Sequence, residues 1–483
     1  MSFKTIAGLL GAIMLLLGVA MAFPLAWSIH FEETAAIRAF IVSICSAFAL
    51  GVLLIFVGRG GHPELRRREG LAVVALAWIL AAAVGALPFT FSDTLPSYID
   101  GYFEAMSGFT TTGSSVLEDI EGAPKGVLFW RDFTQWLGGM GIIVLFIAIL
   151  PSLGVGGRHL FSSEIPGAVK EGLRPRIKDT ALLLWEIYFV LSAAEVVLLK
   201  VQGMSTFDSM CHTFGTMATG GFSPKAASIA AYGSPMIELT VLVFMLFAAT
   251  NFSLYFLVLR GNGFAVFRDI EWRVFIGVIA FCLLAVGAEL VFRGVYTAPL
   301  EALRYSSFQV VSIVTTTGFM TADFDAWPAF SRLLLVALMF LGACSGSTGG
   351  SVKVLRAIVL VKYAYYTAYK VFRPQTVFTL RIGDRVFKGE TVRDIVAFFI
   401  IFSAIFLFGS LAMAAMGLDL VTACTSVSAT MGNVGPGLSG VGPTENFAAV
   451  PDGGKILLSL FMLMGRLELY TVLALVVPAF WKE

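Results

Sequence analysis

Charged residues are scarce in this sequence. Only 13% of its 483 residues are Asp, Glu, Lys or Arg, whereas soluble domains average about 25%. Hydrophobic residues make up 58% of the chain, and the mean hydropathy is +0.86. This composition excludes an ordinary soluble domain and predicts an all-α polytopic membrane protein, whose first partner is the lipid bilayer. The formal net charge of +1 also argues against nucleic acid as a partner.

Cysteine and histidine are also few. The five cysteines form no C-x-x-C pair, so they are interpreted as packing residues and not as a disulfide or zinc framework. Among the four histidines, His159 and His212 have no other potential metal ligands at the spacing of a metal site. A membrane-embedded enzyme would need a nucleophile–base pair or a metal cluster, so we expect no enzyme. No Walker phosphate loop occurs either, and we expect no nucleotide bound by this chain itself.

Long apolar stretches are abundant. About 20 apolar residues cross the hydrocarbon core of a bilayer, and ten stretches are candidates. They are 5–27, 37–57, 71–91, 130–151, 180–201, 235–259, 274–295, 331–361, 393–416 and 455–478. Four semi-apolar segments of 12 to 16 residues are too short to cross, and we expect re-entrant half-helices there. These are 98–109, 204–217, 299–314 and 418–430.

Lys and Arg concentrate in alternate loops. Under the ten-span arrangement, the four basic loops share one side with Lys4 and Lys482, whereas the first half-helix loop is acidic. Basic loops stay cytoplasmic, so we expect a multi-pass membrane protein with both termini cytoplasmic; the family resemblance described below implies the bacterial inner membrane. The basic loops are 58–70, 152–178, 260–273 and 353–393.

Each half-helix leads into a signature that contains glycine. The signatures recur about every 100 residues, which indicates an internal repeat. Because each repeat holds two spans, all copies keep one orientation and can surround an axis along the membrane normal. The signatures are Thr112-Gly113-Ser114, Gly220-Gly221-Phe222, Thr317-Gly318-Phe319 and Val434-Gly435-Pro436.

Four such units together can provide enough backbone carbonyls to replace the water shell of a cation, whereas one unit cannot. Each half-helix would aim its C-terminal end, with about −0.5 charge, at the axis. Glycine permits positive φ angles that turn carbonyls inward, and rings of carbonyls can replace the water shell of a monovalent cation. A single copy is equally explained by a helix cap or a close-packing glycine. Four copies in register favour an ion path.

Four parallel span–P-loop–span units in one chain resemble the Trk/Ktr/HKT superfamily of potassium transporters. The added amino-terminal hairpin, the stretch Gly342–Gly350 and the tail Met464–Glu468 resemble the bacterial Trk potassium uptake systems most. The resemblance covers essentially the whole chain. It implies a pseudo-fourfold pore of M1–P-loop–M2 repeats and ten spans. The expected domains are 1–57 (hairpin), 58–165, 166–262, 263–375 (with a gating loop) and 376–483.

The resemblance assigns a selectivity filter to the signatures, with K⁺ bound by backbone carbonyls. Glycine in all four copies goes with potassium preference in the family, whereas serine in the first goes with sodium. In the second copy either Gly220 or Gly221 fits as the filter glycine, and the fourth copy lacks a hydroxyl. Such unequal walls predict lower selectivity for K⁺ over Rb⁺ or Na⁺. The expected filter residues are Thr111, Thr112, Gly113, Thr219, Gly220, Gly221, Thr316, Thr317, Gly318, Asn433, Val434 and Gly435.

The middle of the eighth span is rich in glycine and hydroxyl residues, which cannot hold a continuous helix. The resemblance makes this stretch an intramembrane loop that obstructs the pore; the alternative is a glycine-rich packing face. The resemblance also places Arg466 under the filter, where its charge opposes cations; the alternative is pairing with a buried carboxylate or carbonyl. The expected gate residues are Gly342, Ser345, Gly346, Ser347, Thr348, Gly349, Gly350 and Arg466.

Charged residues inside the spans lack assigned partners at this point. Glu468 follows Arg466 by two residues, so on one continuous helix they would point about 200° apart and would not pair. Glu186, Glu195 and Glu289 are interpreted as interhelical partners or interface residues.

The function that follows is K⁺ uptake down its electrochemical gradient through a gated filter. A K⁺/H⁺ or K⁺/Na⁺ symporter would share the fold and is the alternative. The resemblance also implies a homodimer and a cytosolic TrkA-type regulatory ring that binds NAD and ATP/ADP. The basic cytoplasmic loops offer suitable docking surfaces for such a ring.

Overall fold

The computed structural model describes residues 1–483 except 62–66, 145–176, 377–378, 384 and 482–483. Within these ranges the regular secondary structure is helical apart from one antiparallel pair of short strands, in which Leu380 lies opposite Phe387. The strands are β1 (Leu380–Ile382) and β2 (Arg385–Phe387). Several predicted features lie wholly or partly outside the described residues: the end of the fourth span, the basic loops 58–70 and 152–178, the domain boundary at 165/166, His159 and Lys482.

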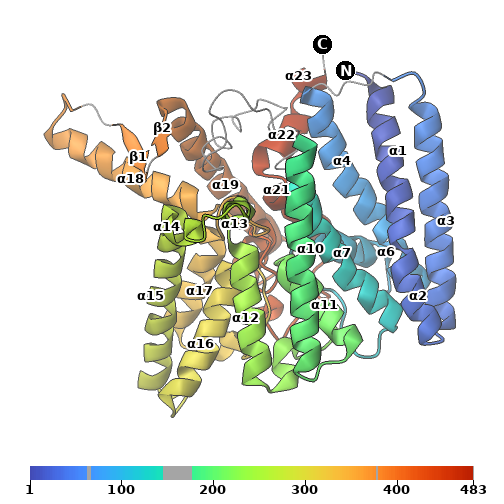
Figure 1. Cartoon of the computed structure of the whole chain (residues 1–483), viewed down its shortest axis with the longest axis horizontal. Helices are drawn as coiled ribbons and strands as arrows, with labels where there is room; N and C mark the ends of the chain where they lie inside the picture. Colours follow the sequence, from blue (N-terminus) through green and yellow to red (C-terminus); the bar gives the residue numbers. More distant parts are fainter. Residues whose placement is uncertain (62–66, 145–176, 377–378, 384, 482–483) are drawn as a thin grey trace.

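The amino-terminal segment forms the expected helical hairpin at one edge of the molecule (Figure 1). It consists of α1 (Phe3–Ala20), α2 (Ala22–His30) and α3 (Thr34–Val57). A Cβ on Gly11 of α1 would lie 2.6 Å from the carbonyl oxygen of Gly51 in α3. Small residues at this contact let the two backbones approach closely, as they do in membrane helix pairs.

The rest of the chain passes four times through the order of long helix, short helix, irregular loop and further helix. The first group is α4 (Arg67–Gly85), α5 (Leu87–Phe91), α6 (Tyr98–Phe109) and α7 (Lys125–Val144). The second is α10 (Ile177–Val201), α11 (Thr206–Met217), η2 (Ser228–Tyr232), α12 (Pro235–Ala249), α13 (Phe252–Leu259) and α14 (Ala265–Arg268). The third is α15 (Ile270–Phe292), α16 (Pro299–Val314), η3 (Phe324–Ala326), α17 (Ala329–Leu341) and α18 (Val354–Phe372). The fourth is α19 (Gly389–Ala415), α20 (Leu420–Met431), η4 (Ser439–Val441), α21 (Asp452–Arg466), α22 (Leu469–Val476) and α23 (Pro478–Trp481).

The short helices α6, α11, α16 and α20 confirm the predicted half-helix positions to within two residues. Their starts are set by local chemistry. Ser97 and Ser205 cap α6 and α11 by accepting the N–H of the residue three positions on, and Asp419 caps α20 in the same manner. Pro299 occupies the first turn of α16, where its missing N–H is harmless. None of the four is long enough to cross a bilayer.

Six described helices are long and apolar enough to cross a membrane, and a seventh crossing arises if one bent pair counts as a span. The ten-span count therefore stays a prediction. The six candidate spans cover 3–30 (α1 with α2), 34–57, 68–91 (α4 with α5), 182–201, 270–292 and 389–415.

Three of the expected spans are interrupted. The break at 342–353, between α17 and α18, was expected from its glycines. The sixth span was expected to be continuous and is not: α12 and α13 meet at 92°. The side chain of Asn251 accepts the N–H of Ser253 at 2.8 Å and thereby starts a new helix. The tenth span breaks at Glu468, whose φ is 59°.

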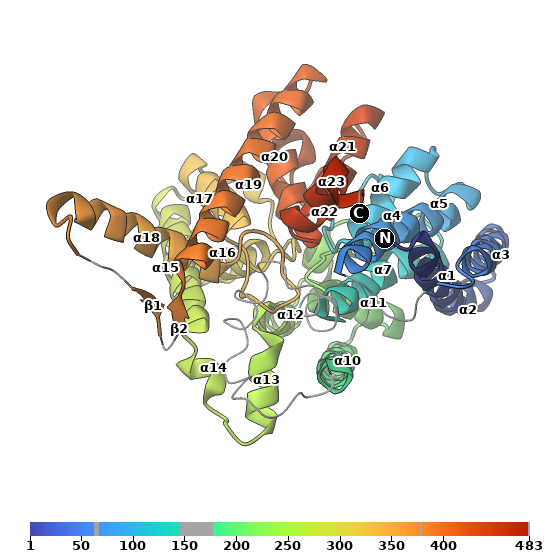
Figure 2. The ribbon, with the colours of Figure 1, turned by 90° about the horizontal axis from the view of Figure 1, so that it is seen from above.

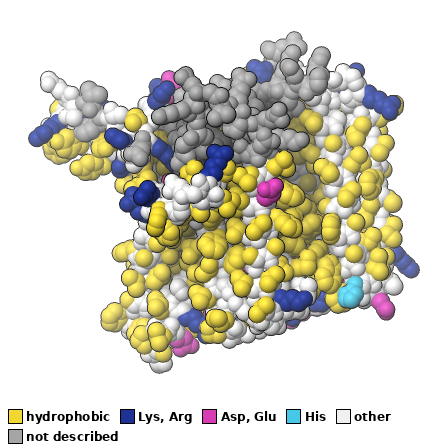
Figure 3. All heavy atoms as spheres, viewed as in Figure 1, with side chains coloured by type: hydrophobic (Ala, Val, Ile, Leu, Met, Phe, Trp, Pro, Cys, Tyr) yellow, Lys and Arg dark blue, Asp and Glu magenta, His cyan; other side chains and the backbone are white. Residues whose placement is uncertain are grey.

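The arrangement of side chains agrees with a membrane environment. In Figure 3 apolar side chains cover the middle of the visible face, and charged side chains gather toward its two ends. The two termini lie at the same end of the molecule, where α18 and the β1–β2 pair project sideways (Figures 1 and 2). Seen from above, the helical groups surround irregular segments near the middle of the molecule (Figure 2). Those irregular segments contain the candidate site.

Candidate pore lining and gate

The loops after the four short helices share one backbone geometry. Each contains two left-handed residues two positions apart, with φ of 51–62° at the first and 75–104° at the glycine. Left-handed angles are unfavourable for a residue with a side chain, so the surroundings must hold the first position in place. The pairs are Thr111 and Gly113, Thr219 and Gly221, Thr316 and Gly318, and Asn433 and Gly435.

The residue between the two left-handed positions makes the same hydrogen bond in every loop. Its N–H donates to the carbonyl five residues earlier, at 2.8–2.9 Å. The donors are Thr112, Gly220, Thr317 and Val434. The counterpart of Gly113 is therefore Gly221, while Gly220 corresponds to Thr112. The register that the sequence left open in the second loop is fixed by this bond.

The four loops close into a ring. A Cβ added to Gly113 would overlap the carbonyl oxygen of Gly220, and one on Gly221 would overlap that of Thr317. A Cβ on Gly318 would overlap the carbonyl oxygen of Val434, and one on Gly435 would lie 3.0 Å from that of Thr112. Each loop thus contacts the next, and the fourth returns to the first. Only glycine satisfies both the backbone angle and the lack of space at these positions.

Buried side chains hold the ring from behind. The Thr110 and Thr112 hydroxyls lie 2.8 Å apart, as do those of Thr315 and Thr317. Between the first and fourth loops, Asn433 Nδ2 donates to Thr112 Oγ1 at 2.9 Å. These bonds connect residues within and between the loops of the ring.

The 342–353 segment packs directly against the ends of the short helices. The Gly350 N–H donates to Thr316 Oγ1 at 2.9 Å, which joins the segment to the third loop. Thr348 Oγ1 lies 3.2 Å from the carbonyl of Met217 and 3.1 Å from that of Ala248. A Cβ on Gly350 would lie 2.5 Å from the carbonyl oxygen of Gly432. The segment therefore contacts the ends of the second, third and fourth short helices, and its irregular backbone is enclosed by protein.

Arg466, the last residue of α21, binds this segment. Its side chain is 3% exposed, Nη1 donates to the carbonyl of Thr348 at 2.5 Å, and Nη2 donates to the carbonyl of Gly138 in α7 at 3.1 Å. Arg466 thus pairs with backbone carbonyls, as the alternative interpretation held, and one of those carbonyls belongs to the predicted gate. The role of the Arg466 charge as a barrier to cations stays a prediction.

An ionic cluster fixes the far end of the segment. Glu468 Oε2 accepts from Arg356 at 2.6 Å, and its Oε1 lies 3.7 Å from Lys353 Nζ. Arg466 and Glu468 do not pair, as expected. The helical-angle argument for this was wrong, because the helix ends between them. The helix break sends Glu468 toward the start of α18.

The other charged residues singled out from the sequence have varied surroundings. Glu289 accepts from the N–H and hydroxyl of Ser331. Glu195 is fully buried and faces Thr216, whereas Glu186 is exposed. His212 is held between the carbonyl of Asp208 and the hydroxyl of Ser223. Its imidazole ring also packs against Phe319, which directly follows the ring glycine Gly318.

Sequence reasoning missed several residues that organise the site. Gln135 and Arg131, both on α7, contact the second loop. Glu271 on α15 accepts N–H bonds from Ser345 at 2.7 Å and Leu355 at 3.1 Å, near the two ends of the 342–353 segment. The available signal was a polar residue inside or beside an apolar span, which usually has a buried partner.

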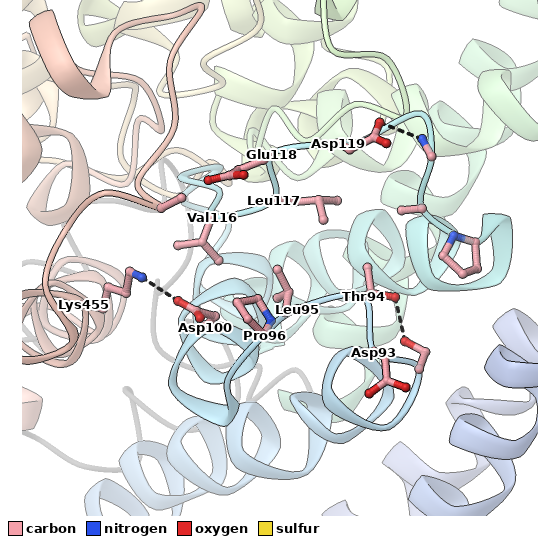
Figure 4. Close-up of a pocket in the computed structure, with 15 residues that line it drawn as sticks. Asp93, Thr94, Leu95, Pro96, Asp100, Val116, Leu117, Glu118, Asp119 and Lys455 are labelled. Atoms are coloured by element: carbon pink, nitrogen blue, oxygen red, sulfur yellow. Dashed lines mark hydrogen bonds and ion pairs between the residues drawn. The ribbon is translucent and has the colours of Figure 1, made fainter.

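A cavity of about 490 Å³ lies beside the first short helix, between α6, the 116–124 stretch and α21 (Figure 4). Lys455 and Asp100 form a buried ion pair of 2.6 Å at its wall. This pair joins the first helical group to the fourth. The side chains of Asp93, Glu118 and Asp119 also line the cavity.

Comparison with known proteins places this geometry in a family. The family model described as "TrkH: Cation transport protein" matches residues 36–482. The chain belongs to the TrkH family. It is 39% identical to the "Trk system potassium uptake protein TrkH" of Escherichia coli (strain K12) and to that of Salmonella typhimurium, over 100% of both chains in each case. It also matches the crystal structure of the potassium transporter TrkH from Vibrio parahaemolyticus, with a TM-score of 0.92, 36% identity and full coverage of both chains.

These matches confirm the family resemblance over the full length. The TrkH family is a family of cation transport proteins, not of enzymes, and the chain has the helical membrane-type fold of its solved member.

Proposed function

We propose that this TrkH-family chain takes up potassium across the bacterial inner membrane through a K⁺-selective filter formed by the four loops. The observation that carries the proposal is the closed ring of Gly113, Gly221, Gly318 and Gly435 with the carbonyls that precede them. Rings of backbone carbonyls are the groups that replace the hydration shell of K⁺. The relatives that match over the full length are named potassium uptake proteins of the Trk system.

The proposed architecture is ten spans in four parallel repeats after the hairpin, with both termini cytoplasmic. Its support is the common loop geometry, and the position of the two termini at one end of the molecule (Figure 1). We further propose a homodimer whose opening is controlled by a cytosolic TrkA-type ring that binds NAD and ATP/ADP. The basic loops and the projecting α18 would face that ring.

The proposed gate is the 342–353 segment with Arg466. The segment lies against the Thr316 end of the ring, and the Arg466 guanidinium holds its Thr348 carbonyl. In this position both the chain and the positive charge oppose cation passage. Movement of the segment would break the Thr348 bond and open the path.

The filter is tested by Gly318→Ser in proteoliposomes, with K⁺ and Na⁺ influx measured side by side. A serine Cβ would overlap the carbonyl of Val434 and would strain a left-handed backbone, so we expect K⁺ influx and K⁺/Na⁺ discrimination both to fall at least about tenfold. Gly294→Ser is the matched control, since Gly294 is also left-handed, with φ 72°, but has nothing within 4 Å of its added Cβ. Unchanged discrimination in a folded Gly318→Ser protein would remove Gly318 from the filter.

A K⁺/H⁺ or K⁺/Na⁺ symporter is the alternative on the same fold. The buried carboxylate of Glu195, which faces Thr216 behind the second short helix, is the group that favours it. In proteoliposomes without a pH or sodium gradient, an uncoupled path reverses its flux at the potassium Nernst potential. A reversal potential that moves with an imposed pH or sodium gradient would establish coupling.

A further inference from the structure

Gln135 binds the second loop of the ring from outside. It lies on α7, in the first helical group, and its side chain is fully buried. Its Nε2 donates to the carbonyl of Gly220 at 2.7 Å, and its Oε1 accepts the N–H of Phe222 at 3.1 Å. The two bonds lie on either side of the left-handed Gly221. One amide therefore fixes the backbone at the ring glycine.

The second loop lacks the pair of hydroxyl groups that bond to each other in the first and third loops. In the first and third loops, threonines at the corresponding positions bond to each other through their hydroxyls. The second loop has Ala218 and Gly220 there, neither of which carries a hydroxyl. A Cβ on Gly220 would overlap the amide of Gln135. Gln135 thus fills the space beside Gly220, at the position where the first and third loops carry Thr112 and Thr317.

The same bond changes the chemistry of one ring carbonyl. The Gly220 oxygen is the one closest to the Cβ position of Gly113, so it belongs to the contact between the first and second loops. An N–H donor on a carbonyl oxygen uses part of its lone-pair density. A carbonyl that is weakened in this way attracts a small, strongly hydrated cation less, and the balance between K⁺ and Na⁺ depends on the number and strength of such ligands.

We propose that Gln135 is a positioning residue for cation selectivity: it holds the Gly220 carbonyl in the ring and weakens the attraction of that oxygen for Na⁺. This inference rests on the proposed filter. Loss of the Gln135 amide has two effects: the backbone of the second loop is free to move, and the Gly220 carbonyl oxygen becomes a stronger cation ligand. Both effects favour Na⁺ relative to K⁺.

The primary variant is Gln135→Met, which keeps the length of the side chain and removes its amide. We expect the K⁺/Na⁺ influx ratio in proteoliposomes to fall about tenfold, the effect of losing one or two neutral buried hydrogen bonds. The matched control is Gln309→Met. Gln309 is equally buried, on α16, but its amide lies against Thr321 and Ala322, beyond the ring. The control is expected to keep the wild-type ratio.

A second variant gives a readout that packing alone would not change. In Gln135→Glu, a protonated carboxyl group can still donate to the Gly220 carbonyl, whereas an ionised one cannot. The K⁺/Na⁺ ratio of this variant should therefore be near wild type at low pH and should fall as the pH rises. The K⁺/Na⁺ ratio of the wild-type protein should not show this change over the same pH range, because the glutamine amide does not titrate. If Gln135→Met fails to fold, a flat pH profile in Gln135→Glu overturns the proposal.

A double variant tests the shared space directly. Gly220→Thr alone introduces a Cβ that overlaps Gln135, whereas Gln135→Ala with Gly220→Thr lets the threonine occupy the vacated volume. The double variant should be more selective than either single variant. An unchanged ratio in folded Gln135→Met overturns this inference alone if Gly318→Ser still lowers discrimination. If neither substitution lowers it, the proposed filter falls as well.

Discussion

Removing the Arg466 guanidinium should open the proposed gate. Arg466→Ala deletes two charge-assisted hydrogen bonds, to the carbonyls of Thr348 and Gly138, at 2.5 and 3.1 Å. Such bonds contribute about 1.5–3 kcal/mol each. Part of this is regained when the carbonyls find other partners, so about 3 kcal/mol of closed-state stabilisation should be lost. This corresponds to a shift of about 100-fold in the ratio of closed to open protein.

The assay is Rb⁺ influx into proteoliposomes that contain no regulatory subunit and no nucleotide. Wild-type protein should give slow influx under these conditions, and Arg466→Ala should give influx faster by one to two orders of magnitude, about 10- to 100-fold. Arg466→Lys is the control, since a point-charge donor keeps the positive charge but cannot reach both carbonyls; it should lie between the two. Folded Arg466→Ala protein with wild-type influx would refute the reasoning, because the arginine would then stabilise both states equally.

Two further perturbations test the anchoring of the site. Glu271→Gln weakens the bonds that the carboxylate accepts from the N–H groups of Ser345 and Leu355. Weaker anchoring of the 342–353 segment should raise unstimulated Rb⁺ influx about 3- to 10-fold. An unchanged influx would show that the segment does not move at this point. Lys455→Met leaves the buried Asp100 carboxylate without its ion-pair partner. The free energy of unfolding should therefore fall by about 3–5 kcal/mol, which a lower melting temperature would show. The double variant Lys455→Met with Asp100→Leu should recover most of this stability, and failure to recover would mean that the pair itself has no such role.

The local features of the fold follow closely from the sequence. Helix caps and hydrophobic length set the starts and ends of the short helices, and for 98–109 and 299–314 the predicted bounds coincide with α6 and α16. The glycines at 342–350 likewise mark the break between α17 and α18. These features depend on neighbouring residues along the chain, through capping, backbone angles and propensity. The sequence therefore contains them directly.

Features that depend on contacts between distant segments were not predictable in this way. The bend at Thr250 and Asn251 occurs in an apolar stretch that reads as one span, and the 342–353 segment packs against it through the bond from the Phe252 N–H to the Gly346 carbonyl. The register of the second loop was open because both Gly220 and Gly221 permit positive φ. The bond from the Gly220 N–H to the carbonyl of Gly215 decides it.

The sequence by itself determined a helical membrane protein with four glycine-containing loops, because hydrophobic length and residue-level backbone freedom are local properties. The tertiary structure alone decided which groups meet at the ring: Gln135 reaches Gly220 across 85 positions, and Arg466 reaches Thr348 across 118. A buried polar group bonds to whatever unsatisfied partner lies within reach. Which partner that is depends on how the helices pack.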